Sequence, residues 1–169
     1  MKKLIPMTML SLLSTGALAT LNSPYTMAVI EGTDGAEEIR DGLYQQGIED
    51  IAKNLAASDY HELVAMQMNL CVAYANTYEI SSASEACDKA IDLTQKYKRQ
   101  GAQARKIAAL ALNNRAILKI KSQDFDGALE DLMQALDVKN DAVIKRNLLK
   151  IQQLQTQAAE VASTQSSEV

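Results

Sequence analysis

The chain has 169 residues, with 21 acidic and 17 basic side chains and a formal net charge of −4 at pH 7. Nucleic acid and anionic membrane surfaces are disfavoured as its main partners, because both repel an acidic protein. With one phenylalanine and no tryptophan, leucine, isoleucine, alanine and methionine must fill the core, and this composition suits close packing of helix on helix.

The N-terminus has the features of a secretory signal peptide. A lysine pair precedes an apolar stretch over residues 4–17, and an A-x-A cleavage motif ends at Ala19. This stretch is too short to span a membrane, and no later segment is apolar over the required length. We predict that residues 1–19 are cleaved after Ala19, with cleavage after Ala28 as the alternative, and that the protein is periplasmic or secreted. A buried N-terminal helix is the other interpretation.

The next segment is predicted to be a lead into the folded domain. Residues 20–35 carry one proline and two glycines, which favour a flexible or extended conformation. No proline follows residue 24, so the rest of the chain can form continuous helices. The helical pattern starts near Ala36 and resumes after a turn at Gly42. We interpret residues 36–57 as a degenerate half-repeat.

One pattern of small and apolar residues then occurs twice. From Asn69, and again from Asn114, a small residue follows after two positions, an alanine after twelve more, an apolar residue after four and a second alanine after three. Such recurrence predicts stacked helical hairpins, because small residues at fixed points let helices pack closely. The predicted segments are full repeats over 64–97 and 109–142, a C-terminal helix over 141–155 and a disordered tail over 156–169.

Polar residues before these helices predict where each one begins. Short side chains with an oxygen atom at a helix start accept hydrogen bonds from first-turn backbone N–H groups. The predicted N-caps are Asp59, Ser82, Asp124 and Asn140. We therefore expect one helical domain over residues 36–155.

The two full units resemble the tetratricopeptide repeat family, whose helix–turn–helix repeat is about 34 residues long. The matching positions are Cys71, Tyr74, Ala83, Cys87 and Ala90 in the first unit and Ala116, Lys119, Ala128, Leu132 and Ala135 in the second. Lys119 departs from the family's tyrosine, and the terminal proline is missing from both units. The resemblance implies an all-α fold, a short α-solenoid of antiparallel hairpins with a concave face.

In that family ligands bind on the concave face, so the resemblance implies a surface for a protein or peptide partner. The candidate partner-binding residues are Met68, Asn69, Val72, Asn76, Asn113, Asn114, Ile117 and Lys121, to which the last helix could add Ile144 and Asn147. Asn69 and Asn114 recur at one motif position, and their amides offer a donor and an acceptor to a peptide backbone. The alternatives are that these asparagines bond the neighbouring helix and that the apolar candidates belong to the core.

Cys71 and Cys87 are the only cysteines and occupy facing positions of one predicted hairpin. An exported protein meets an oxidising compartment, so we predict a disulfide. It would close a loop of about 16 residues and add roughly 3 kcal/mol in the chain-entropy model. The alternative is a pair of buried free thiols. No metal site is predicted, because there is no C-x-x-C motif and His61 has no partner at ligand spacing.

The sequence contains no phosphate-binding loop, nucleophile motif or metal-ligand cluster. We therefore predict a non-enzyme, without catalytic residues or cofactors. The leading hypothesis is a protein-interaction scaffold of the bacterial periplasm. The alternative is a self-associating structural protein, a homo-oligomer formed through its terminal helices, and an enzyme is the third hypothesis.

Overall fold

The computed structural model describes residues 24–96 and 101–166. This part of the chain forms seven α-helices and no strand, so the predicted all-α class is confirmed. The helices are α1 (Ala36–Arg40), α2 (Tyr44–Asn54), α3 (Tyr60–Asn76), α4 (Ile80–Gln95), α5 (Ala102–Lys121), α6 (Phe125–Val138) and α7 (Ala142–Ser166). The predicted signal peptide, with its cleavage site at Ala19, lies outside the described residues.

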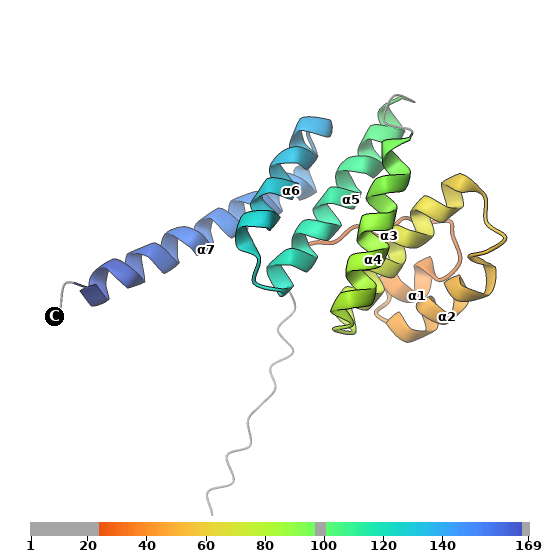
Figure 1. The fold of residues 1–169 in the computed structure, drawn as a ribbon, viewed down its shortest axis with the longest axis horizontal. Helices are drawn as coiled ribbons and strands as arrows, with labels where there is room; N and C mark the ends of the chain where they lie inside the picture. The colour runs from red at the N-terminus through yellow and green to blue at the C-terminus, as the bar shows by residue number, and fades with distance from the viewer. Residues whose placement is uncertain (1–23, 97–100, 167–169) are drawn as a thin grey trace, which may run out of the picture.

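The helices follow one another as an elongated array of hairpins (Figure 1). α3 packs on α4, and α5 packs on α6. Contacts of α5 with both α3 and α4 join the two hairpins. α1 and α2 pack against α3 at one end, and α7 packs against α6 at the other.

Alanines of the repeated pattern lie where helix backbones approach closely. Ala83, Ala116 and Ala128 are completely buried. Gly47 of α2 lies at the position that corresponds to Ala83 and Ala128, and a Cβ atom on Gly47 would lie 2.4 Å from Cγ1 of Ile39. At Gly47, α1 and α2 are therefore too close together to leave room for the methyl group of an alanine.

Side-chain caps begin three of the seven described helices, α3, α6 and α7. Asp59 and Asp124 accept hydrogen bonds from first-turn backbone N–H groups of α3 and α6, which confirms both predicted caps. Ser82 lies inside α4, whose start has no side-chain cap, so that prediction was wrong. At the start of α7 the backbone N–H is bound by Asp141 rather than by Asn140. A shift of one residue is expected where two neighbouring residues can both cap.

Cys71 of α3 and Cys87 of α4 form a disulfide, with Cα atoms 4.9 Å apart. Both side chains are buried within the hairpin. They occupy the facing small and apolar positions that the repeated pattern indicated. The bond therefore joins the two helices of one hairpin within their buried interface.

An ion-pair network lies between the helices of the hairpin formed by α5 and α6. Arg115 of α5 donates to both carboxylate oxygens of Asp131 on α6, at 2.9 and 2.8 Å. Lys119 Nζ lies 3.0 Å from the same carboxylate, whose side chain is 3 % exposed. Arg115 also donates to Asp88 of α4 at 2.8 Å, and its hydrogen bonds to Asp131 raise the pKa of its guanidinium well above the usual range. The network connects α4, α5 and α6.

The last helix extends further than predicted. α7 continues to Ser166, past the expected end at residue 155. Ile151 is its last buried residue, and residues 152–160 are exposed. Figure 1 shows this distal part projecting from the array. Glutamine and alanine are good helix formers, so local propensity continues the helix beyond the point where tertiary burial ends.

Candidate functional site

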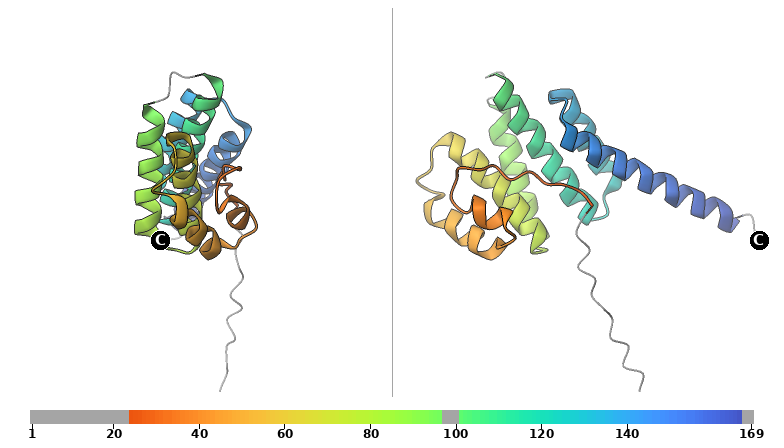
Figure 2. Two further views of the ribbon diagram at one scale, coloured as in Figure 1. Left: turned by 90° about the vertical axis from the view of Figure 1, so that its right-hand side faces the viewer. Right: turned by 180° about the vertical axis from the view of Figure 1, so that it is seen from behind.

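Residues 24–31, which we call the strap, cross one face of the array without belonging to any helix (Figure 2). The strap passes α7, α5 and α3 before the chain turns into α1. These three helices carry the candidate partner-binding residues. Residues 24–31 of the predicted flexible lead are therefore an ordered part of the candidate surface.

Two asparagines each bind both backbone polar groups of one strap residue. The N–H of Ala28 donates to Oδ1 of Asn114 at 2.7 Å, and Nδ2 of Asn114 donates to the Ala28 carbonyl at 2.8 Å. Asn69 makes the same pair of bonds with Ile30, at 2.8 and 2.9 Å. Each amide thus replaces the hydrogen bonds that a neighbouring β-strand would supply.

A third pair of bonds holds Thr26. Asn147 of α7 accepts from the N–H of Thr26 at 3.0 Å and donates to its carbonyl at 2.9 Å. Asn113 donates to the same carbonyl at 3.0 Å and accepts from Asn147 at 2.8 Å. The four asparagines, at most 1 % exposed, form what we call the asparagine ladder: Asn69, Asn113, Asn114 and Asn147. The ladder binds every second residue of the strap, the spacing that an extended chain requires.

Side chains of the strap contribute to two parts of the core. Ala28 and Ile30 pack against the cluster that contains Met68. Val29 packs against the other cluster, formed largely by α3 and α4, and Met27 contacts both. Apolar packing on both sides and hydrogen bonds beneath the backbone hold the strap in place.

The structure brings most of the predicted partner-binding residues together, with two corrections. Asn69, Asn113 and Asn114 hydrogen-bond a peptide backbone, as the sequence indicated for two of them, but this backbone belongs to the same chain. Met68 is fully buried in the core, so it offers nothing to a partner. The sequence reasoning missed the strap itself. Its signal was the recurrence of asparagines in three alternate helices, α3, α5 and α7, the last being Asn147.

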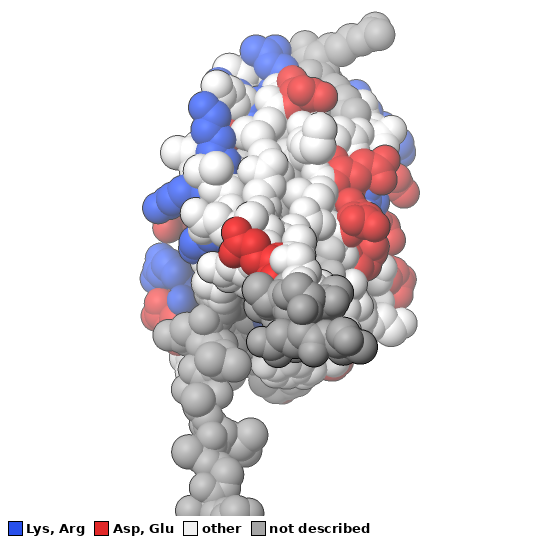
Figure 3. Space-filling view, turned by 90° about the vertical axis from the view of Figure 1, so that its left-hand side faces the viewer, with Lys and Arg blue, Asp and Glu red and all other residues white. Residues whose placement is uncertain are grey.

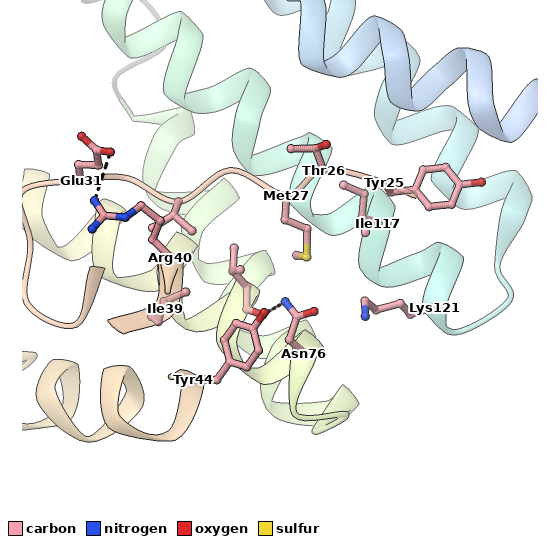
Figure 4. A pocket seen from close by; sticks show the side chains of 12 residues that line it. Tyr25, Thr26, Met27, Glu31, Ile39, Arg40, Tyr44, Asn76, Ile117 and Lys121 are labelled. Atoms are coloured by element: carbon pink, nitrogen blue, oxygen red, sulfur yellow. Dashed lines mark hydrogen bonds and ion pairs between the residues drawn. The ribbon is translucent and has the colours of Figure 1, made fainter. Parts of the chain in front are cut away.

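An open pocket of about 620 Å³ lies beside the strap (Figure 4). The remaining candidate residues line it: Val72, Asn76, Ile117 and Lys121. The strap contributes Met27 and Val29, and α1 and α2 contribute Ile39, Arg40 and Tyr44. In Figure 4 the side chains of Met27, Asn76 and Lys121 surround the same open space. The pocket is thus lined by both apolar and polar side chains, and its charged groups are Glu31, Arg40 and Lys121.

The two cationic groups of the pocket differ in their partners. Arg40 lies 3.3 Å from Asp41 and 3.7 Å from Glu31, and its hydrogen bond to Asp41 raises the pKa of its guanidinium. Lys121 has no acidic partner within the described residues, and its Nζ lies 5.3 Å from the centroid of the Tyr78 ring. Burial lowers the pKa of Lys121, so a carboxylate brought to it would be stabilised.

The described residues offer no group of histidine, cysteine, aspartate and glutamate that could hold a metal ion. Within the same ranges no helix is long and apolar enough to cross a membrane. No known protein family, curated protein or solved structure matches the chain. The strap, the ladder and the pocket are therefore the features of this chain that indicate its function.

Proposed function

We propose that this protein is a non-catalytic interaction scaffold that binds a protein or peptide on the face formed by α3, α5 and α7. The observation that carries the proposal is the asparagine ladder, which holds an extended polypeptide by its backbone. Side-chain amides that bond N–H and C=O groups select a conformation rather than a sequence. A surface of this kind is suited to binding unfolded or extended segments of other proteins.

We further propose that the array is a short tetratricopeptide-like solenoid exported to the bacterial periplasm. Hairpin succession and the buried alanines Ala83, Ala116 and Ala128 support the first part. The disulfide between Cys71 and Cys87 supports the second part, because such bonds persist in oxidising compartments. The lysine pair, the apolar stretch over residues 4–17 and the A-x-A motif ending at Ala19 also support export.

The proposed function is tested by asking whether the ladder binds an extended peptide supplied from outside. In full-length Ala28→Pro protein, proline removes the N–H that Asn114 binds and loosens the strap. The probe is a terminally blocked synthetic peptide with the sequence of residues 24–33. At micromolar concentration, well below the millimolar range needed for weak contacts, we expect fluorescence anisotropy to show binding to Ala28→Pro protein and none to the wild type, whose ladder is occupied.

Two matched variants control this experiment. Met27→Pro alters the neighbouring position, whose N–H makes no hydrogen bond within the described residues, so its strap should stay seated and exclude the probe. The double variant Ala28→Pro, Asn69→Ala loosens the strap and also removes one asparagine of the ladder. It should bind the probe about tenfold more weakly than Ala28→Pro alone. Circular dichroism checks that each variant is folded. Failure of folded Ala28→Pro protein to bind the probe would refute a backbone-binding surface.

Export is tested by the intact mass of the protein from a periplasmic fraction, with and without reductant and an alkylating reagent. A chain that begins at Thr20, with both thiols blocked until reduction, is expected. An uncleaved chain with two free thiols would contradict export and would direct the search for partners to the cytoplasm.

Self-association is the second candidate function, and the distal part of α7 favours it. Leu154 is 45 % exposed there and Leu149, just before it, is 57 % exposed. Glu160 is the only charged residue between Ile151 and Ser166 in the sequence. Figure 3 shows this end of the array, where basic and acidic side chains gather on opposite sides of a largely uncharged band. Light scattering should detect a dimer that Leu154→Glu disrupts and Gln153→Glu preserves. A monomer at micromolar concentration would exclude this candidate.

A further inference from the structure

The strap presents a second row of backbone polar groups that the ladder does not use. Thr26, Ala28 and Ile30 direct both their N–H and C=O groups to the asparagines. In an extended chain the polar groups of successive residues point in opposite directions. The N–H and C=O groups of Met27 and Val29 therefore point away from the ladder, and they make no hydrogen bond to any described residue. The strap is thus an extended segment with one free edge, which resembles the edge strand of a sheet in its unpaired backbone groups.

This free edge lies next to the pocket that holds Lys121. Met27 and Val29 line that pocket with their side chains, and Figure 4 shows Met27 directed into it. Side chains of a strand added to the edge would alternate in the same two directions as those of the strap. Every second side chain of the added strand would therefore lie over the pocket.

The lining of the pocket selects the side chains that fit. Among its lining residues, Met27 and Val29 of the strap are half-buried, and Val72, Ile117 and Ile39 are buried. These apolar groups favour aliphatic side chains. Lys121 is partly buried without a carboxylate partner within the described chain, which favours one acidic side chain near the end of α5. Glu31 is the only charged residue of the strap and is already beside Arg40, so it does not supply this charge.

We propose that an extended segment of a partner protein adds to the free edge of the strap as a β-strand, with alternating aliphatic side chains and one acidic side chain that pairs with Lys121. This inference rests on the proposed interaction function and specifies how the partner is bound. Backbone bonds to Met27 and Val29 supply affinity, and the pocket supplies selectivity. The strap remains seated on the ladder throughout.

The test uses the full-length protein and a terminally blocked heptapeptide, Thr-Val-Thr-Glu-Thr-Val-Thr, titrated to millimolar concentration. We expect the amide signals of Met27 and Val29 to shift in NMR spectra while that of Ala28 stays unchanged. A peptide with glutamine in place of glutamate should bind at least about threefold more weakly. Methylating the peptide's amides on one edge should abolish binding, whereas methylating those on the other edge should not.

Variants of the protein separate pairing from other contacts. Val29→Pro removes one outward N–H and should weaken the peptide about tenfold. Val29→Ala removes the side chain but keeps the N–H, so pairing should persist. Lys121→Gln should erase the preference for glutamate over glutamine. Unchanged exchange protection of Ala28 and Ile30 verifies that each variant keeps its strap seated.

The inference is overturned if the heptapeptide leaves Met27 and Val29 unaffected, or if both methylated isomers bind equally. It is also overturned if Val29→Pro dissociates a dimer of the free protein, because the edge would then belong to a second copy. Binding of the residue 24–33 peptide to Ala28→Pro protein would still support the proposed function in each of these cases. Loss of both kinds of binding would reject the function together with the inference.

Discussion

Asn114 bonds both the N–H and the C=O of Ala28, although the two residues are 86 positions apart in the chain. A single buried side chain thereby fixes the strap to α5, the second of the three helices that the strap crosses. Asn69 and Asn147 repeat this arrangement on either side. The surface that the family resemblance assigned to partners is thus formed jointly by the helices and the strap.

Asn114→Ala should lower the free energy of unfolding by about 1–3 kcal/mol, because it leaves the polar groups of Ala28 without their partners in a partly buried position. Urea denaturation measures the change. The matched control is Asn76→Ala, since the Asn76 amide donates only to the Val72 carbonyl of its own helix. That control should change stability by less than about 0.5 kcal/mol. Equal losses in the two variants would mean that the ladder adds no stability.

Hydrogen exchange along the strap should alternate between slow and fast. The amides of Ala28 and Ile30 are bound by Asn114 and Asn69, so we expect them to exchange at least about tenfold more slowly than the amides of Met27 and Val29. NMR of the full-length protein measures all of these amides together. Uniformly fast exchange would indicate that the strap leaves the ladder readily, and uniformly slow exchange would indicate that its outer edge is already paired.

Asp131→Ala should lower the free energy of unfolding by about 3–5 kcal/mol. It leaves the cations of Arg115 and Lys119 without the buried carboxylate that both contact. Thermal or urea unfolding measures the effect. Asp88→Ala is the control, because the Asp88 side chain is 52 % exposed and contacts only Arg115 of this network. Its cost should not exceed about 1 kcal/mol. A small loss in both variants would show that the network is not essential to the hairpin.

Reducing the disulfide should lower the free energy of unfolding by roughly 3 kcal/mol, because the bond no longer restricts the conformations of the unfolded chain. Cys71 and Cys87 are 16 positions apart and link α3 to α4, whereas the N–H of Ala28 is bound by Asn114 of α5. Exchange protection of Ala28 should therefore survive reduction under native conditions. The measurement is urea denaturation with and without reductant, and Cys71→Ala with Cys87→Ala as a double variant controls for effects of the reductant. Unchanged stability would contradict a structural role for the bond.

Much of the helical array could be predicted because its signals are local. The recurrence of small residues at Ala83, Ala116 and Ala128 marks helix contacts, and all three are buried. Asp59 and Asp124 cap the helices that they precede. The cap predicted at Ser82 was wrong because the same sequence pattern can occur inside a helix and at its start, and Ser82 lies inside α4.

The candidate site was less accessible to sequence reasoning. Met68 and Asn69 are neighbours in one helix, yet Met68 lies in the core and Asn69 bonds the strap. Which of them faces a ligand depends on the packing of α3 against other helices, and this packing cannot be derived from the helix alone. The length of α7 was underestimated for the opposite reason. A polar, alanine-rich segment remains helical without burial when its propensity is high.

The sequence by itself determined the helical class, the hairpin repeat and the chemistry of the asparagines, because periodicity and side-chain type act over short distances. Only the tertiary structure decided what those asparagines bind. Their partner is a segment 39 to 121 positions away. This pairing requires that the helices stack, so that the asparagines of α3, α5 and α7 lie in one row. The same stacking leaves one edge of the strap free beside Lys121 and thereby creates the surface proposed for a partner.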